Sequence, residues 1–430
     1  MAREYRDQME STVEHVLSNG LRIVVLPFRD WPVAATLACY RAGSLHEPDG
    51  CAGIAHLMEH MMFRGTEKFP GGAIDAMTAR LGGVNNAVTT TDYAAYYFAL
   101  PRDGWITALE IEADRIQNCR IDHDVLEIER RVALEERRMA SDDPESMVDE
   151  ALDAAMFGDH AYGRPVMGLM RDIAGLSAKD MTSFYASRYV PANVSIVVVG
   201  GVSVDDAFAA TERLFGDLPE TAVAGADPVE LDRPAPRREC ITTDRSTPRI
   251  AMGFPTPDAL DPDSPALELL VTLLASGRSS RLYDRLVRRD RVATEVSCSR
   301  LLQREPGSFT MSATLHPGAS PARAERAMIE EITSIAGSVL SDDEFRKARR
   351  LARADLAAAH DTALGAAATL ALWEAVDTWR AGVAFEKRMR ELGPEDLTRV
   401  AMRFLDRERM SCVWFRPADD GGDPAGEARS

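Results

Sequence analysis

The stretch from Cys51 to Gly65, CAGIAHLMEHMMFRG, carries apolar side chains at helical spacing near the start of the chain. Strand-like segments precede it, and a run rich in valine, threonine, tyrosine and phenylalanine, residues 84–100, follows it after Gly82-Gly83. Helices set among strands in this way predict a mixed fold. In the rest of the first half we expect strands at 21–26, 34–40 and 194–200, and helices at about 107–119, 124–140 and 204–215.

The second half repeats this order weakly. Its expected strands are 239–243, 248–254, 307–315 and 411–415, with a helix at 264–276 and long helices between 320 and 390. Strands grouped with helices in each half predict an α+β fold of two similar domains, each a mostly antiparallel sheet packed with helices. The expected boundaries are a first domain at 1–220, a proline- and alanine-rich linker at 221–237, a second domain at 238–417 and a disordered tail at 418–430.

The charge balance argues against nucleic acid as a partner. The 430 residues carry a formal net charge of −18, which phosphate backbones repel unless a local basic patch intervenes. The arginines from Arg346 to Arg353 have acidic neighbours at Asp343, Glu344 and Asp355, which is typical of a solvated helix face. We therefore expect no nucleic-acid partner.

Cysteine spacing and hydropathy bear on the compartment. The six cysteines are widely scattered without a CxxC pair, which favours buried reduced thiols over disulfides or a cysteine metal site. No apolar run is long enough to span a membrane, and the first fifteen residues, MAREYRDQMESTVEH, lack the apolar core of a secretory signal. We expect a cytoplasmic protein without a membrane partner, or a periplasmic one if a signal has been removed.

The run His56-Leu57-Met58-Glu59-His60 carries the candidate chemistry. Residues three and four apart share one face of a helix, so both imidazoles and the carboxylate of Glu59 point the same way. Two neutral imidazoles at this spacing can hold one Zn²⁺, with Glu59 next to the water that the metal activates. Glu59 would take the proton of that water and pass it to a leaving amine. The alternative is a helix face with surface histidines.

A catalytic zinc needs a third protein ligand, and the acidic run from Glu127 to Glu136 is the best source. Glu129 and Glu136 are seven residues apart on one helix face, while Glu135 points about a quarter-turn away. One of the two could bind the metal while the other orients a ligand. A solvated charged face would have the same composition, so spacing alone does not select Glu136.

Three motifs together resemble a known family. HLMEH with the following MMFRGTEKFPGG, the run ERRVALEERRMASDDP, and VNNAVTTTDYAAYYFAL are similar to the pitrilysin-type zinc peptidases, the inverzincins. Within this family the chain resembles a half-length form, the catalytic subunit of mitochondrial processing peptidase. HAYGRPVMG and PANVSIVVVGGV extend the resemblance, which covers about 200 residues in the right order.

The resemblance implies roles for particular residues. The third ligand of that branch lies 76 positions after the second histidine, which is Glu136 here, and the supporting acid seven residues earlier is Glu129. Substrate peptides of the family add to an exposed strand edge, which implies contacts at Asn86, Ala87 and Val88. The family therefore implies a zinc endopeptidase that cuts unstructured peptides in a closed chamber, with one zinc ion per chain.

The second half departs from the family at its substrate-gripping pair. Aligning SSRLYDRL places Val287 at the expected arginine and Thr294 at the expected tyrosine, with Arg288 and Tyr283 nearby but out of register. Active members build a chamber of four such domains, so a two-domain chain needs a second chain. We expect a heterodimer whose partner supplies the pair. A homodimer that lacks it and a non-catalytic assembly subunit are the alternatives.

Overall fold

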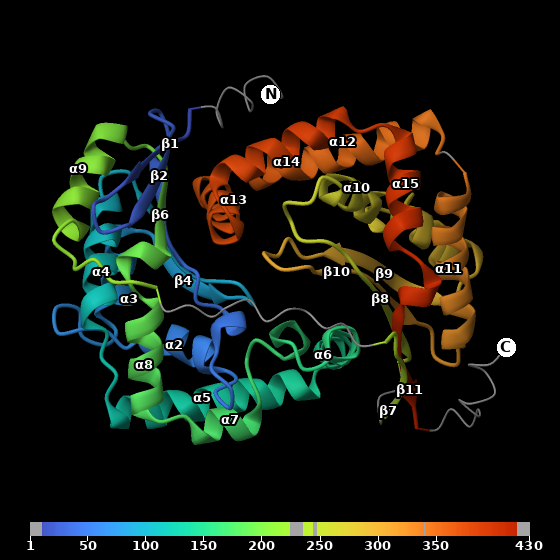
Figure 1. Ribbon diagram of the computed structural model, residues 1–430, viewed down its shortest axis with the longest axis horizontal. Coiled ribbons are helices and arrows are strands. Elements are labelled where there is room, and N and C mark those ends of the chain that lie inside the picture. Colours follow the sequence, from blue (N-terminus) through green and yellow to red (C-terminus); the bar gives the residue numbers. More distant parts are fainter. Residues whose placement is uncertain (1–10, 224–234, 244–246, 339, 419–430) are drawn as a thin grey trace. The chain divides into compact units, whose positions relative to one another are not determined.

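The computed structural model describes residues 11–223, 235–243, 247–338 and 340–418 (Figure 1). Most of the linker expected at 221–237 and nearly all of the tail expected at 418–430 lie outside these residues. The chain divides into two compact units. The first comprises Met1–Met139, Pro165–Val229 and Leu356–Val383, and the second comprises Ala140–Arg164, Glu230–Asp355 and Ala384–Ser430.

The first unit is built on a six-stranded sheet in the order β1-β2-β6-β3-β5-β4. The β2–β6 pair is parallel, and the other neighbouring strands are antiparallel. The strands are β1 (Val13–Val16), β2 (Arg22–Pro27), β3 (Val33–Tyr40), β4 (Val84–Thr89), β5 (Ala94–Pro101) and β6 (Val194–Gly200). The helices are η1 (Ser44–His46), α2 (Ile54–Phe63), α3 (Ala73–Leu81), α4 (Trp105–Asn118), α5 (His123–Asp142), α7 (Met170–Gly175), α8 (Ala178–Arg188), η3 (Pro191–Asn193), α9 (Val204–Phe215) and α13 (Ala363–Val376).

Both faces of this sheet are buried, because alternate residues of the central strands enter two different cores. On β3, Ala34 and Ala38 pack into a core that also contains the apolar residues of α2, α4 and α9. Ala35 and Leu37 point to the opposite face, where α13 covers β3 and β6. The near-continuous apolar run of β6 follows from burial on both sides, since all seven of its residues are buried.

The second unit holds a five-stranded sheet in the order β7-β11-β8-β10-β9. Its β7–β11 pair is parallel and the remaining pairs are antiparallel, so the connectivity matches that of the first sheet without β1. The strands are β7 (Arg238–Thr243), β8 (Arg249–Pro255), β9 (Ala293–Arg300), β10 (Ser308–Leu315) and β11 (Ser411–Pro417). The helices are α6 (Pro144–Phe157), η2 (Ala161–Gly163), α10 (Ser264–Ala275), the π-helix η4 (Tyr283–Arg289), α11 (Pro321–Gly337), α12 (Asp342–Ala359), α14 (Trp379–Glu391), α15 (Pro394–Phe404) and η5 (Arg407–Arg409).

The α+β class and the two similar halves are confirmed. The compact units differ from the expected contiguous domains because each takes one helix from the other half of the chain. Helix α6 packs its apolar face on β8 and β11, where Met156 fills the space above Gly253. Helix α13 covers β3 and β6 of the first sheet. Residues 140–164 and 356–383 are thereby exchanged between the units.

Several elements were not expected from the sequence. Strand β9, ATEVSCSR, alternates exposed and partly buried residues and contains few strongly apolar side chains, so its pattern resembles a loop. The missed elements are β1, β9, the short helices α3, α7 and α8, and helices α6 and α15. Among the described residues, no helix is both long enough and apolar enough to cross a bilayer.

We expect the carboxylate of Glu374 to fix α13 on the first sheet. It is fully buried, accepts hydrogen bonds from Ser195 Oγ (2.9 Å) and the N–H of Trp379 (2.8 Å), and lies 3.4 Å from Arg22 Nε. Glu374→Ala should lower the free energy of unfolding by about 3 kcal/mol in urea titrations, because two buried hydrogen-bond donors lose their acceptor and Arg22 loses one of its carboxylate partners.

The control is Glu374→Gln, which keeps the acceptor oxygen and should cost much less. Burial raises the pKa of Glu374, so the folded chain keeps the proton on this carboxyl group at pH values at which the unfolded chain has lost it. The parent should therefore lose stability relative to the Gln variant as the pH rises from about 4.5 through the folded pKa. Equal stabilities of the Ala and Gln variants would contradict this role.

Candidate metal centre

Helix α2 carries His56, Glu59 and His60, and its start is fixed by a carboxylate. Glu47 Oε1 accepts hydrogen bonds from the N–H groups of Gly53 (3.0 Å) and Ala55 (3.1 Å), which have no partner inside the helix. The opposite face of α2 is core: Leu57, Met58, Met61 and Met62 are fully buried. The motif face is therefore held away from the core by the packing of its neighbours.

Helix α5 presents two glutamates and two arginines, each pair seven residues apart. Arg130 donates to the carbonyl oxygens of Ile173 (2.6 Å) and Leu176 (2.5 Å). Arg137 Nε donates to the carbonyl oxygen of Gly168 at 3.0 Å. These bonds fix α5 against the segment around α7. They also set the rotation of the helix, so that the adjacent residues Glu129 and Glu136 face the histidines of α2.

Two glycines bring that segment against the start of α2. Gly53 and Gly168 have positive φ angles of 100° and 84°, a region that side chains other than glycine disfavour. A Cβ on Gly168 would lie 2.3 Å from the Cα of Gly53 and from the carbonyl oxygen of Ala52. The close approach of the two backbones thus requires glycine, and it links α2 through Arg137 to α5.

The three expected ligands converge. Ligand atoms of His56, His60 and Glu136 all lie within 4.8 Å of one another. Glu136 Oε2 lies 3.3 Å from His60 Nε2 and 3.8 Å from His56 Nε2. Atoms bound at about 2.0–2.2 Å to a tetrahedral zinc lie roughly 3.3–3.6 Å apart, so the spacing suits one such ion. Among the described residues no other group of histidine, cysteine and acidic side chains has this arrangement.

The burial and the protonation of these ligand atoms also suit a bound metal. Glu136 Oε2 is buried and accepts no hydrogen bond from the described residues, although the side chain as a whole is 39% exposed. Burial, with a smaller effect of His60, lowers the pKa of His56 to about 4. His56 is therefore neutral near pH 7, which is the form of imidazole that binds metals.

The acid expected to support the ligands lies behind His60. Glu129 is 1% exposed, and its Oε2 lies 3.3 Å from His60 Nδ1, while Oε1 lies 2.5 Å from Arg64 Nε. This contact leaves His60 Nε2 facing Glu136. Sequence analysis did not identify Arg64, which directly follows α2 and partly neutralises the buried carboxylate.

The expected base contacts the edge strand. Thr89 Oγ1, at the end of β4, donates to Glu59 Oε2 at 2.5 Å. Burial raises the pKa of Glu59, an effect that the Thr89 hydrogen bond opposes. Thr89 was also missed, because a threonine at the end of a strand has no signal that distinguishes it from an ordinary strand residue.

Strand β4 carries Asn86, Ala87 and Val88 and is the last strand on its side of the sheet. It pairs with β5 alone, so one row of its N–H and C=O groups has no strand partner within the described residues. Asn86 and Val88 are exposed, with Val88 at 43%. The edge next to Glu59 can therefore accept an extended chain.

The second unit lacks the arginine and the tyrosine with which the family grips its substrate. Val287 lies half-buried on η4, and Thr294 on β9 donates its hydroxyl to the carbonyl oxygen of Thr314 at 3.2 Å. Neither position supplies a guanidinium or a phenol. Helix α10, which follows β8 as α2 follows β3, carries no histidine.

Comparison with family models matches residues 32–169 to "Insulinase (Peptidase family M16)" and residues 175–351 to "Peptidase M16 inactive domain". The first match contains His56, Glu59, His60, Glu129 and Glu136. The second covers residues in which the described part of the chain shows no metal-ligand cluster. This division agrees with the placement of the candidate centre in the first unit.

Similar proteins extend over most of the chain. "Zinc protease PqqE" of Helicobacter pylori is 25% identical over 97% of this chain and 94% of its own length. An uncharacterised zinc protease of Mycobacterium tuberculosis is 30% identical over 70% of this chain and 69% of its own length.

Solved structures share the fold. A protease from Helicobacter pylori superposes with a TM-score of 0.90 at 25% identity, covering 94% of this chain and 99% of that one. The first half of the periplasmic protease PqqL from Escherichia coli superposes with a TM-score of 0.78 at 20% identity, covering 98% and 96%. The second likeness concerns the fold alone.

The contact between Gly53 and Gly168 should be needed to build the centre. Gly168→Ala places a methyl group where the Gly53 backbone lies, in a strained backbone region, and should cost about 1–3 kcal/mol of stability. We also expect weaker zinc binding, measured by competition with a chromophoric chelator.

Gly175→Ala is the matched control in the same segment, because an added Cβ there meets nothing within 4 Å. Zinc affinity that is unchanged in Gly168→Ala would show that this contact does not position the ligands.

Proposed function

The chain belongs to peptidase family M16, and on that premise we propose that it is a zinc-dependent endopeptidase acting on unstructured peptides. One observation carries the proposal: His56, His60 and Glu136 bring three ligand atoms within 4.8 Å of one another, with Glu59 on the same helix face. Two imidazoles and a carboxylate are a ligand set of known zinc peptidases. The names of the relatives agree, since they are called zinc proteases.

In this proposal His56, His60 and Glu136 hold the zinc. When bound, zinc acts as a Lewis acid that makes water a better nucleophile and stabilises negative charge on the attacked carbonyl oxygen. Glu129 accepts from His60 Nδ1 and so orients the ring that binds through Nε2. Arg64 holds Glu129 from the other side.

Glu59 is the general base. It removes a proton from the attacking water and delivers it to the nitrogen of the leaving amine, so that the peptide C–N bond breaks without expelling an amide anion. Burial favours the protonated form that must exist between these two transfers, and Thr89 holds one oxygen of the carboxylate in place.

The substrate binds along β4. An extended peptide can add to its open edge, where Asn86, Ala87 and Val88 offer backbone groups and alternate side chains. This edge ends at Thr89, which contacts the base. Strand addition requires an extended chain, so the substrate class is unfolded or flexible peptide.

A second chain completes the enzyme. Val287 and Thr294 cannot grip a substrate as the family's arginine and tyrosine do, so a heterodimeric partner that carries this pair is the favoured assembly. A self-sufficient homodimer is the second possibility. The match of residues 175–351 to an inactive domain keeps a non-catalytic subunit as the third. The cytoplasmic location stays a prediction from the N-terminal residues.

Hydrolysis of a quenched fluorescent peptide by the zinc-loaded chain tests the proposal. We expect turnover that a chelator abolishes and zinc restores. Glu59→Gln, which keeps the ligands, should bind zinc as the parent does but lose at least about 100-fold in kcat.

Equal rates for the parent and Glu59→Gln would contradict the assignment of the base. Zinc binding without turnover by the chain alone would contradict the homodimer. In that case, addition of a partner chain that carries the arginine–tyrosine pair should restore turnover. Failure to do so would favour the non-catalytic subunit.

The contact of Thr89 with the base gives a second expectation. Thr89→Val keeps the shape of the side chain but removes the hydroxyl that orients Glu59, and should lower kcat about tenfold with little change in KM. Thr89→Ser should recover most of the rate, because it restores the donor. A valine variant as fast as the parent would show that this hydrogen bond is not used in catalysis.

A further inference from the structure

The second unit contains a polar hollow that the proposed chemistry does not use. Its volume is about 480 Å³, and it is lined by Arg278, Ser279, Tyr283 and Arg288, from the end of the α10 loop and from η4. A hollow of this size accommodates the end of a peptide. Its lining side chains carry hydrogen-bond donors on positive or neutral groups, and none of them is a carboxylate.

The surrounding segment is basic in an otherwise acidic chain. Residues 278–291 contain six arginines and two aspartates, whereas the whole chain has a net charge of −18. Two of these arginines are neutralised by acids. Arg281 pairs with both oxygens of Glu344 (2.6 and 2.9 Å), and Arg285 pairs with Asp290 at 2.8 Å. Glu330 binds Arg285 at 2.7 Å and Glu331 lies 3.8 Å from Arg281, so these two arginines leave no positive charge unpaired.

The arginines nearest the hollow are not balanced in this way. Arg288 and Arg289 share the single carboxylate of Asp284, at 2.8 and 2.6 Å. Arg278 is exposed and makes no ion pair or hydrogen bond with the described residues. The hollow therefore carries a surplus of positive charge, and a fully unpaired guanidinium lines it.

Two further groups add donors. Tyr283 is half-buried, and its hydroxyl makes no hydrogen bond with the described residues. The ammonium group of Lys347 on α12 contacts the carbonyl oxygen of Ser279, which places a third cation beside the two arginines of the lining. A guanidinium, a phenol and a nearby ammonium together favour a planar anion that accepts several hydrogen bonds.

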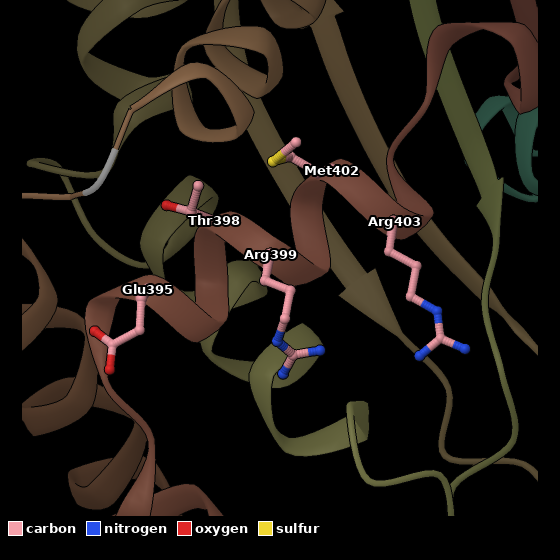
Figure 2. A pocket seen from close by; sticks show the side chains of 5 residues that line it. All are labelled: Glu395, Thr398, Arg399, Met402 and Arg403. Carbon is pink, nitrogen blue, oxygen red and sulfur yellow. The ribbon is translucent and has the colours of Figure 1, made fainter.

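A second hollow in the same unit shows the contrast. It lies on α15, has a volume of about 350 Å³ and is also lined by two arginines, Arg399 and Arg403 (Figure 2). There both guanidinium groups bind the buried Asp263, at 2.7 and 2.6 Å, and Arg399 also binds Asp396 at 3.1 Å. Those arginines are balanced by two acids and serve the packing of α15.

We propose that the hollow lined by Arg278, Ser279, Tyr283 and Arg288 is a carboxylate-binding site for peptides. Arg278 and Tyr283 supply the donors that have no other partner, and Arg288 adds the second positive charge. The inference that the ligand is a peptide rests on the proposed function. The site selects peptides by a C-terminal carboxylate or an acidic side chain.

Binding of labelled peptides to the zinc-loaded Glu59→Gln chain tests this site without consuming the ligand. The probes are one fluorescein-labelled ten-residue peptide of alanine, glycine, serine and leucine with a free C-terminal carboxylate, the same peptide amidated, and the amidated peptide with one internal glutamate. We expect the free carboxylate or the glutamate to strengthen binding about tenfold over the neutral peptide. Arg278→Gln combined with Tyr283→Phe should abolish this preference and leave the affinity of the neutral peptide unchanged.

Arg326→Gln is the matched control: it removes one exposed arginine of the same unit that does not line the hollow, and the preference should remain. Equal affinity for all three peptides, or a preference that survives in the double variant, would overturn the site. If the parent binds inorganic phosphate but shows no preference among the three peptides, the site is also overturned. Its ligand would then be free phosphate. A chain that hydrolyses peptides without carboxylate preference keeps the proposed function and loses only this site.

Discussion

The candidate centre depends on one constraint, the fixed distance and rotation between helices α2 and α5. Neither helix can hold a metal alone, since α2 supplies two imidazoles and α5 the carboxylate. The constraint is met by backbone contacts away from the ligands. Gly168 touches Gly53 at the start of α2, and its carbonyl oxygen accepts from Arg137 of α5. Because Arg137 follows Glu136 directly, the residue that anchors α5 and the residue that would bind the metal lie on the same turn of the helix.

The second unit shows what the same framework does without these groups. Its sheet has the same connectivity, and α10 occupies the place in chain order that α2 has in the first unit. Helix α10 reads SPALELLVTLLA, and nine of its twelve residues are buried, so it serves the core. The fold itself is therefore compatible with either role, and function must be argued from the side chains. The family models also differ along the chain, since residues 32–169 match an insulinase model and residues 175–351 match an inactive-domain model.

Much of the first half could be predicted from the sequence, because its signals are local. The spacing of His56, Glu59 and His60 is a helical pattern, and residues 194–200 form a strand that is almost entirely apolar and is buried at every position. Resemblance, not spacing, selected Glu136 over its neighbours on α5. What could not be predicted depends on tertiary contacts. Thr89 becomes important only when the end of β4 lies beside α2.

The compact units differ from the expected domains for the same kind of reason. Only Asp143 separates α6 from α5, and nothing in residues 144–157 shows that their apolar face belongs to β8 and β11. Strand β9 was missed because its outward face carries serine and threonine. Ser297 and Ser299 form cross-strand hydrogen bonds of 2.7 Å with Ser312 and Thr310. Polar pairs of this kind stabilise a sheet but weaken the alternation by which strands are recognised.

X-ray absorption spectroscopy at the zinc edge of the purified, zinc-loaded chain tests the central claim most directly. The account predicts one zinc per chain, nitrogen and oxygen ligands at about 2.0–2.2 Å, the multiple-scattering signature of two imidazoles, and no sulfur shell. Glu136→Gln should alter the oxygen shell and keep both imidazoles. A sulfur shell at about 2.3 Å, or a spectrum without imidazole, would place the metal elsewhere and contradict the account.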